Sequence, residues 1–383
     1  MSAEPELIAR VRGRLAGDHT LPTRARVAAA LRDEVGVRGS GQVLAATETL
    51  RSELVGAGQL EPLLHEPGVT DVLVNGASEV WVDRGHGLEL SDVRFDDERD
   101  VRRLAVRLAA AAGRRLDDAV PCADIRLADG VRLHAVLPPV SPSACLSFRV
   151  PRRKAFRLDE WVASGSMPEA AADLLLQLLV ARRSFVVTGG TGTGKTTLLA
   201  TLLGHVDGRE RIVLVEDSAE LRPEHPHVVR LEARAANSEG VGAIELRALV
   251  REALRMRPDR LVVGEVRGAE CVDLLAALNV GHDGGAGTLH ANSAADVPAR
   301  IEALCTAGGL SRTATHSQLA AGLRLVVHLV RDVAGGRKLD SIGVVRRRSD
   351  GLVEVVPAVR VFADTVVDEP GRRELDELLE PAR

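Results

Sequence analysis

Residues 189–196 read Gly189-Gly190-Thr191-Gly192-Thr193-Gly194-Lys195-Thr196. This stretch matches the pattern of a P-loop, in which two glycines separated by four residues are followed by lysine and threonine. Its flanks also fit, because the apolar run 184–188 predicts a strand before it and residues 197–203 predict a helix after it. The stretch therefore predicts a nucleoside triphosphate site within an α/β fold.

Each residue type in this stretch has a physical part in binding phosphate. Glycines let backbone N–H groups approach phosphate closely, and the N-terminus of the following helix favours an anion. Lys195 is expected to reach the β- and γ-phosphates, and Thr196 to ligate Mg²⁺. ATP and Mg²⁺ are the expected ligands. The candidate binding residues are Gly189, Gly190, Thr191, Gly192, Thr193, Gly194, Lys195, Thr196 and Thr197.

Two further apolar runs end in acidic residues. Residues 211–215 lead into Glu216 and Asp217, and residues 260–264 lead into Glu265. Ligand sites of open α/β sheets lie at the carboxyl ends of the strands, so both acidic sets are expected beside the P-loop. Phosphoryl transfer needs such carboxylates to hold the metal ion and to orient water. The pair therefore predicts hydrolysis of ATP rather than binding alone.

The chain divides by composition into four parts. Residues 1–58 carry apolar stripes at helical spacing and predict a helical N-terminal segment. Short alternating strands and an Asp-Gly hairpin in residues 59–150 predict an α+β domain. Residues 151–165 read as a linker. Residues 166–383 alternate strands and helices, which predicts a doubly wound α/β domain whose first helix starts at a Ser166–Glu169 capping box.

Two patterns in the last part leave alternatives open. Arg247, Arg251 and Arg255 recur every four residues on a predicted helix, either as a salt-bridged face or as a surface for a subunit or a phosphate. The glycine-rich stretch 281–292 carries His282 and His290. Each histidine is either structural or able to sense the γ-phosphate by hydrogen bonding.

The composition disfavours a dedicated nucleic-acid binder. The net charge is −4, the pI is about 6.3, and aromatic residues make up 2% of the 383 residues, with no tyrosine. The four cysteines form no Cys-x-x-Cys pair, so no zinc site is predicted. We see no signal peptide and no transmembrane segment, and expect a cytoplasmic protein.

The order of motifs resembles the type II/IV secretion ATPase superfamily. The P-loop corresponds to its Walker A motif, residues 215–221 to its Asp-box, residues 263–268 to its Walker B motif and residues 281–292 to its His-box. Residues 70–76, 129–139 and 147–149 are similar to the N-terminal domain of the tight-adherence branch, which assembles Flp pili. Type II secretion and type IV pilus extension motors usually carry a tetracysteine zinc insertion, which this chain lacks.

The resemblance implies a RecA-like P-loop NTPase core preceded by a smaller α+β domain. It also implies a homo-hexameric motor that powers pilus assembly or protein secretion from the cytoplasmic face of the membrane. The expected partner is an inner-membrane platform protein of the pilus or secretion apparatus, and the chain would associate with this complex peripherally. No nucleic-acid partner is expected.

The resemblance also suggests roles for individual residues. Glu216 would activate the attacking water and Glu265 would hold Mg²⁺ together with Thr196, although these two glutamates could exchange roles. His290 would contact the γ-phosphate with support from His282. The arginines expected at the phosphates are, from the N-terminal domain, Arg132 and Arg149, and, as fingers from a neighbouring subunit, Arg234 and Arg267.

Three other functions remain as alternatives. The first is a related ATPase of type IV secretion that acts in DNA conjugation. The second is a RecA-like nucleic-acid motor, which the acidic pI and scarcity of aromatics disfavour. The third is a nucleotide-binding regulator without turnover, which the presence of both Glu216 and Glu265 disfavours.

Overall fold

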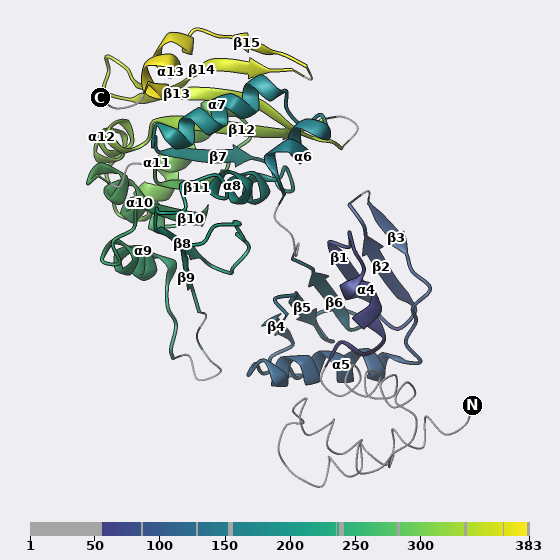
Figure 1. Cartoon of the computed structure of the whole chain (residues 1–383). Coiled ribbons are helices and arrows are strands. Elements are labelled where there is room, and N and C mark those ends of the chain that lie inside the picture. The colour runs from purple at the N-terminus through teal and green to yellow at the C-terminus, as the bar shows by residue number, and fades with distance from the viewer. Residues whose placement is uncertain are drawn as a thin grey trace. The chain divides into compact units, whose positions relative to one another are not determined.

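The computed structural model describes residues 56–85, 87–127, 129–151, 156–234, 236, 241–281, 284–332, 335–362 and 364–380. The predicted helical segment 1–58 thus lies almost wholly outside the described residues. The chain divides into two compact units, Met1–Arg153 and Lys154–Arg383. Each unit is described by itself below (Figure 1).

The first unit is a six-stranded sheet with helices on one face. Its sheet has the order β3-β2-β1-β6-β5-β4, and all neighbouring strands are antiparallel. Its elements are η1 (Gly58–Leu60), α4 (Glu61–His65), β1 (Asp71–Asn75), β2 (Glu79–Asp83), β3 (Leu88–Leu90), α5 (Glu98–Ala111), β4 (Cys122–Arg126), β5 (Arg132–Val136) and β6 (Cys145–Arg149).

Alternation along these strands buries one face of the sheet. Val72 and Val74 of β1 are buried, whereas Asp71 and Leu73, which alternate with them, are partly exposed. Helix α5 begins after the Asp97 cap and packs its apolar stripe, including Leu104 and Leu108, into the same core. The predicted Asp-Gly hairpin is confirmed, since β4 and β5 pair across it.

The second unit is built on a nine-stranded sheet. Its elements are α6 (Leu158–Ala163), α7 (Glu169–Val180), β7 (Phe185–Gly189), α8 (Lys195–Leu203), β8 (Ile212–Glu216), β9 (Val228–Glu232), α9 (Leu246–Leu254), β10 (Arg260–Val266), α10 (Glu270–Asn279), β11 (Ala286–His290), η2 (Ala294–Asp296), α11 (Val297–Ala307), α12 (Arg312–Gly322), β12 (Leu325–Arg331), β13 (Arg337–Arg347), β14 (Val353–Val361), β15 (Val366–Asp368) and α13 (Arg372–Leu379).

The sheet order is β15-β14-β13-β12-β7-β11-β10-β8-β9. The six strands from β12 to β9 are parallel to their neighbours, and the other three strands extend the sheet in antiparallel pairing. The carboxyl ends of β7, β8, β10, β11 and β12 therefore lie along one edge. This edge is where an α/β sheet holds its ligand.

Helices cover both faces of this sheet, as a doubly wound fold requires (Figure 1). Phe185 and Val187 of β7 pack in one core with α6, α7, α8 and α13, whereas Val186 packs in the other core with α9, α10, α11 and α12. Neighbouring residues of a buried parallel strand thus serve opposite layers. The predicted doubly wound sheet is confirmed.

Three details differ from the sequence-based expectations. The helix predicted to be capped by Ser166 begins at Glu169 with Pro168 at its N-cap, so the capping box is wrong. Part of the predicted linker 151–165 forms α6, whose Trp161 is buried in the core of the second unit. Glu265 lies within β10 rather than after it.

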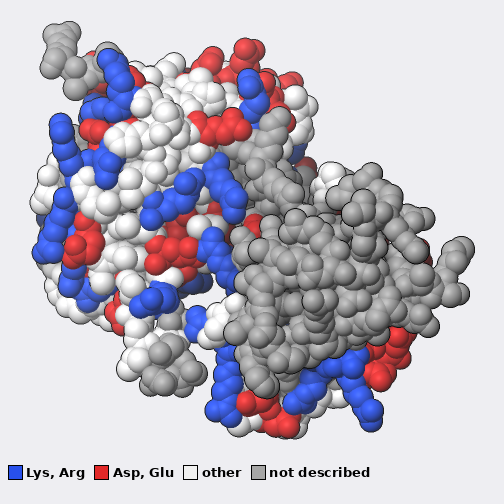
Figure 2. All heavy atoms as spheres, turned by 60° about the horizontal axis from the view of Figure 1, so that its bottom comes forward, with Lys and Arg blue, Asp and Glu red and all other residues white. Residues whose placement is uncertain are grey.

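The surface carries charges of both signs. Basic and acidic side chains are interspersed over the described residues visible in Figure 2. This mixture is in keeping with a net charge of only −4. Among the described residues, no helix is long and apolar enough to cross a membrane.

Candidate nucleotide-binding site

The P-loop connects β7 to α8 at the carboxyl edge of the sheet. Gly189 has a φ of +146°, and a Cβ there would lie 2.3 Å from the carbonyl oxygen of Leu329 on β12. Gly194 has a φ of +95° and forms the N-cap of α8. These conformations and close approaches require glycine. The loop therefore turns directly into the positive end of a nine-residue helix.

Lys195 lies inside this loop. Only 7% of the residue is exposed, and its Nζ donates to the carbonyl oxygens of Gly189 at 3.1 Å and Gly190 at 2.7 Å. Burial lowers the pKa of the ammonium group below its usual value. The loop thus holds a cation among its own carbonyls, where a phosphate oxygen would be a stronger partner.

A hydrogen-bonded chain links Lys195 to the neighbouring strands. His290 ends β11 and pairs in register with Gly189, which places its Nδ1 3.4 Å from the Lys195 Nζ. Its Nε2 lies 2.9 Å from the Oε1 of Glu265 on β10. Burial, together with the Lys195 charge, lowers the pKa of His290. A neutral imidazole fits these contacts, with Nδ1 accepting from the ammonium and Nε2–H donating to the carboxylate.

Glu216 ends β8 as a buried carboxylate. Its Oε1 accepts from the backbone N–H groups of Glu220 and Leu221, both at 2.9 Å. Its Oε2 is buried and has no hydrogen-bond partner among the described residues. The side chain packs against Gly264 of β10, where a Cβ would lie 2.6 Å from the Glu216 Cγ. Burial raises the pKa of this carboxyl group, which makes it a stronger base.

The two candidate finger arginines have different surroundings. The Arg267 guanidinium contacts Asp217 and lies 3.8 Å from the Oε2 of Glu265, so carboxylates of its own chain hold it. Arg234 is exposed and lies beyond β9 on a ribbon closed by a bridge to Ile244. Its Nε donates to the carbonyl oxygen of Gly242 at 2.8 Å.

The remaining predicted site residues lie in three different parts of the chain. Arg132 and Arg149 are register partners on β5 and β6 of the first unit, and their role at phosphate stays a prediction. His282 lies outside the described residues. Thr196 and Thr197 lie in the first turn of α8, as a P-loop requires.

The oxygen donors at the site fit Mg²⁺. The described residues contain no group of three or more His, Cys, Asp or Glu side chains able to hold a metal ion by themselves. Mg²⁺ commonly uses one or two protein oxygens together with substrate phosphates. The Thr196 hydroxyl and the Glu265 carboxylate are donors of this kind, so the metal would enter together with ATP.

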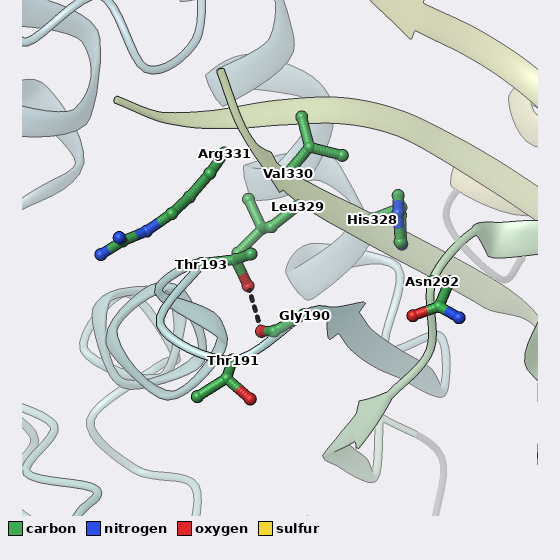
Figure 3. A pocket seen from close by; sticks show the side chains of 8 residues that line it. All are labelled: Gly190, Thr191, Thr193, Asn292, His328, Leu329, Val330 and Arg331. Atoms are coloured by element: carbon green, nitrogen blue, oxygen red, sulfur yellow. Dashed lines mark hydrogen bonds between the residues drawn. The ribbon is translucent and has the colours of Figure 1, made fainter. Parts of the chain in front are cut away.

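The sequence pattern missed three residues beside the P-loop. A hollow of about 290 Å³ is lined by P-loop residues and by Asn292, His328 and Arg331 (Figure 3). His328 is buried next to Thr188, with its Nδ1 2.9 Å from the threonine hydroxyl, and burial lowers its pKa. Pairing of β12 with β7 brings His328 and Arg331 to the loop, and pairing of β11 with β7 brings Asn292, which follows β11. For Arg331, the local signal in the sequence is its position as a basic residue at the end of the largely apolar run 325–330.

The solved structures support the fold. The pilus retraction motor PilT with bound ADP has a TM-score of 0.54 and 20% identity, covering 74% of this chain and 81% of PilT. Fold and P-loop together define a P-loop NTPase with a RecA-like core.

The family follows from the sequence comparisons. The chain belongs to the type II/IV secretion system protein family, whose model matches residues 53–378. A putative conjugal transfer protein of Mycobacterium tuberculosis is 58% identical over 325 residues, covering 83% of this chain and 92% of that protein. Type IV secretion system protein PtlH of Bordetella pertussis is 31% identical over 297 residues, covering 71% and 87%.

Proposed function

We propose that this chain hydrolyses ATP with Mg²⁺ as a homo-hexameric motor. The motor would power pilus assembly or protein secretion from the cytoplasmic face of the membrane, where an inner-membrane platform protein would receive the force. The observation that carries this proposal is the chain of contacts from Lys195 through His290 to Glu265. Lys195 follows the loop after β7, His290 ends β11 and Glu265 lies one residue before the end of β10, and these three strands are adjacent and parallel. The triphosphate and its metal would therefore meet all three groups.

The site suggests a division of labour between the two glutamates. Glu216 is our candidate base, because its Oε2 has no partner among the described residues and its raised pKa favours taking a proton from water. Glu265 is our candidate for the Mg²⁺ shell. His290 lies between Lys195 and Glu265, where it would sense the γ-phosphate by hydrogen bonding.

In a ring, a neighbouring subunit would supply an arginine finger, whose positive charge would stabilise the transition state. Of the two finger candidates, Arg234 better suits action on a neighbouring subunit, because it is exposed beyond the edge strand β9, whereas Arg267 is held by Asp217 of its own chain. An arginine finger contributes about 10³–10⁵ in turnover. The monomer is therefore expected to be nearly inactive.

A second candidate function is the conjugation type of type IV secretion ATPase. Its support is the 58%-identical relative, which bears the name of a putative conjugal transfer protein. Deleting the gene in its native host separates the two functions. Loss of surface pili or of a secreted protein supports the first, and loss of DNA transfer with intact pili and secretion supports the second.

A biochemical test addresses the motor class itself. We expect the purified full chain to hydrolyse ATP as a hexamer, measured by phosphate release alongside its mass in solution, with no stimulation by single-stranded DNA. Stimulation by DNA would instead support a nucleic-acid motor. A confirmed hexamer without turnover would support a nucleotide-binding regulator.

A further inference from the structure

The outer side of the P-loop rests on strands β12 and β13. Gly189 lies against the Leu329 carbonyl group, as described above. A Cβ at Gly194 would lie 3.2 Å from Arg337 of β13 and 3.2 Å from Trp161. A Cβ at Gly192 would lie 3.3 Å from the Arg331 guanidinium. The loop thus packs against side chains that the Walker A pattern does not contain.

Arg331 makes a polar contact with the loop. β12 pairs in parallel with β7, with Leu329 opposite Gly189, so Arg331 lies beside the next residues of the loop (Figure 3). Its Nε donates to the carbonyl oxygen of Gly192 at 3.2 Å. The carbonyls of Gly189 and Gly190, by contrast, accept from Lys195 of the loop itself.

The charge of Arg331 is not neutralised locally. Its side chain is exposed, and it forms no salt bridge within the described part of the chain. Arg267, on the other side of the site, contacts Asp217 instead. A full positive charge therefore stands next to the phosphate-binding loop, where it would attract a polyanion.

The direction of the hydrogen bond is also significant. The Gly192 C=O and the Thr193 N–H belong to one planar trans peptide, in which the two groups point in opposite directions. Holding the carbonyl oxygen toward Arg331 on the outer side directs the Thr193 N–H to the opposite side. Backbone N–H groups of this loop are the groups that a P-loop offers to phosphate.

We infer that Arg331 is a positioning residue that orients the Gly192–Thr193 peptide and thereby slows the release of bound nucleotide. This inference rests on the proposed function, that the P-loop binds ATP and ADP. Its effect belongs to affinity, because Arg331 lies on the side of β7 away from Glu265 and Glu216. Loss of Arg331 is thus expected to raise KM more than it lowers kcat.

The test measures how fast ADP leaves the full-length chain. Fluorescent methylanthraniloyl-ADP with Mg²⁺ is bound and then chased with excess unlabelled ADP in a stopped-flow instrument. We expect Arg331→Ala to release it about three- to tenfold faster, the range for losing one charge-assisted hydrogen bond at an exposed position. Arg331→Lys, which keeps the charge, should give an intermediate rate.

Arg324→Ala is the matched control. Arg324 directly precedes the same strand at its opposite end, is exposed, and donates to the carbonyl oxygen of Ala320. It should release ADP at the wild-type rate. Thermal melting of all variants checks that they are folded. If Arg331→Ala does not fold, the release rate of Arg331→Lys still tests the inference.

Each outcome decides between specific claims. Wild-type release rates in a folded Arg331→Ala or Arg331→Lys variant would overturn the inference. A fall in kcat with unchanged release and KM would also overturn it, in favour of a role in the chemical step. Failure of the wild-type chain itself to bind ADP would overturn the proposed function, and this inference with it.

Discussion

At the scale of single residues, the two carboxylate oxygens of Glu216 have contrasting surroundings. Backbone N–H groups of Glu220 and Leu221 hold Oε1, whereas Oε2 is buried without a partner among the described residues. An unpartnered buried oxygen is costly, and costly features gather at functional sites. The charged form of Glu216 thus destabilises the fold while providing a base.

The first prediction concerns Glu216→Gln. The amide keeps an oxygen for the two N–H groups but cannot take a proton, so ATP turnover should fall by about 100-fold or more. Thermal stability should rise at neutral pH, because the variant removes a buried charge. Phosphate release and melting temperature check the two effects. Glu252→Gln, at an exposed position, should change neither.

The sign of the stability effect depends on pH. The folded-state pKa of Glu216 lies above its ordinary value of 4.5, so the wild-type protein gains stability relative to Glu216→Gln as the pH falls through the folded pKa. The difference in melting temperature should therefore be largest above that pKa and vanish below about 4.5. A variant that is less stable than wild type at neutral pH contradicts the assignment.

The second prediction concerns the pH dependence of turnover. Because burial raises the pKa of Glu216, kcat/KM should decline on the acid side at a pH above the range of an ordinary carboxyl group. Burial and the Lys195 charge lower the pKa of His290 and so favour its neutral imidazole, and we assign the acid limb to Glu216. His290→Asn should thus lower the rate and keep the acid limb. An acid limb near pH 4.5 in the wild type would refute the role of Glu216.

At the scale of elements, Asp273 joins two helices. Arg247 and Arg251 of α9 donate to its two carboxylate oxygens from 2.5 and 2.7 Å, and Arg255 pairs with the exposed Glu252. The arginine stripe is therefore a salt-bridged face, which was one of the two interpretations of its spacing. We call Arg247, Arg251 and Asp273 the clamp. It joins α9, which follows Arg234 in the chain, to α10, which follows the Walker B strand β10.

The third prediction compares two acidic residues of this face. Asp273→Ala should lower the free energy of unfolding by about 1–3 kcal/mol, because it leaves two arginines without their buried acceptor. Glu252→Ala removes an exposed ion pair and should change it by less than about 0.5 kcal/mol. Urea denaturation followed by circular dichroism measures both. Equal effects would contradict a special role for the clamp.

The fourth prediction uses two glycines of one loop. Gly284 has a φ of +80°, and a Cβ there would lie 2.8 Å from the buried guanidinium of Arg260. Gly281 has a φ of +92° with open space around it. Backbone strain should lower the stability of both alanine variants by about 1 kcal/mol. Gly284→Ala should lose about 1–3 kcal/mol more, because Arg260 must move. Similar melting temperatures would rule out the steric contribution.

Sequence patterns predicted the elements where local signals suffice. Buried strands such as β7 and β8 stand out as apolar runs, and the P-loop carries its own glycines. The prediction of a Ser166 cap was wrong because Pro168 disfavours a helical conformation at Met167. The Ser166 hydroxyl instead forms a hydrogen bond with the Ser164 hydroxyl, and the Ser166 carbonyl oxygen accepts from the Leu339 N–H. Arg331 was missed because its role depends on pairing between residues about 140 apart, which no local pattern encodes.

At the scale of the whole molecule, we propose that the site is completed by a neighbouring subunit of a ring. The described P-loop unit contains a lysine, two carboxylates and a histidine, and its exposed Arg234 lies on a ribbon beyond the edge strand β9. An edge strand with an exposed extension is suited to contact another subunit. The hexamer would therefore bring the arginine of one subunit to the nucleotide of the next.

The fifth prediction tests this exchange by mixing inactive variants. Lys195→Ala lacks a working P-loop but keeps Arg234, whereas Arg234→Ala keeps its P-loop. Mixed rings should hydrolyse ATP at least about tenfold faster than either variant alone, because a finger contributes about 10³–10⁵. No recovery in rings shown to be mixed would place Arg234 outside the neighbouring site. Arg267→Ala in the same assay should show no recovery.

The measurement closest to the central claim is Mg²⁺-dependent phosphate release by Lys195→Ala. The full-length variant would be compared with wild type and with Lys338→Ala, a lysine outside the loop that donates to the Gly165 carbonyl. We predict hydrolysis by the wild-type and Lys338→Ala hexamers, and at least about a 100-fold loss for Lys195→Ala with unchanged mass in solution. Equal hydrolysis by Lys195→Ala and wild type would contradict the assignment of an ATPase site to residues 189–196.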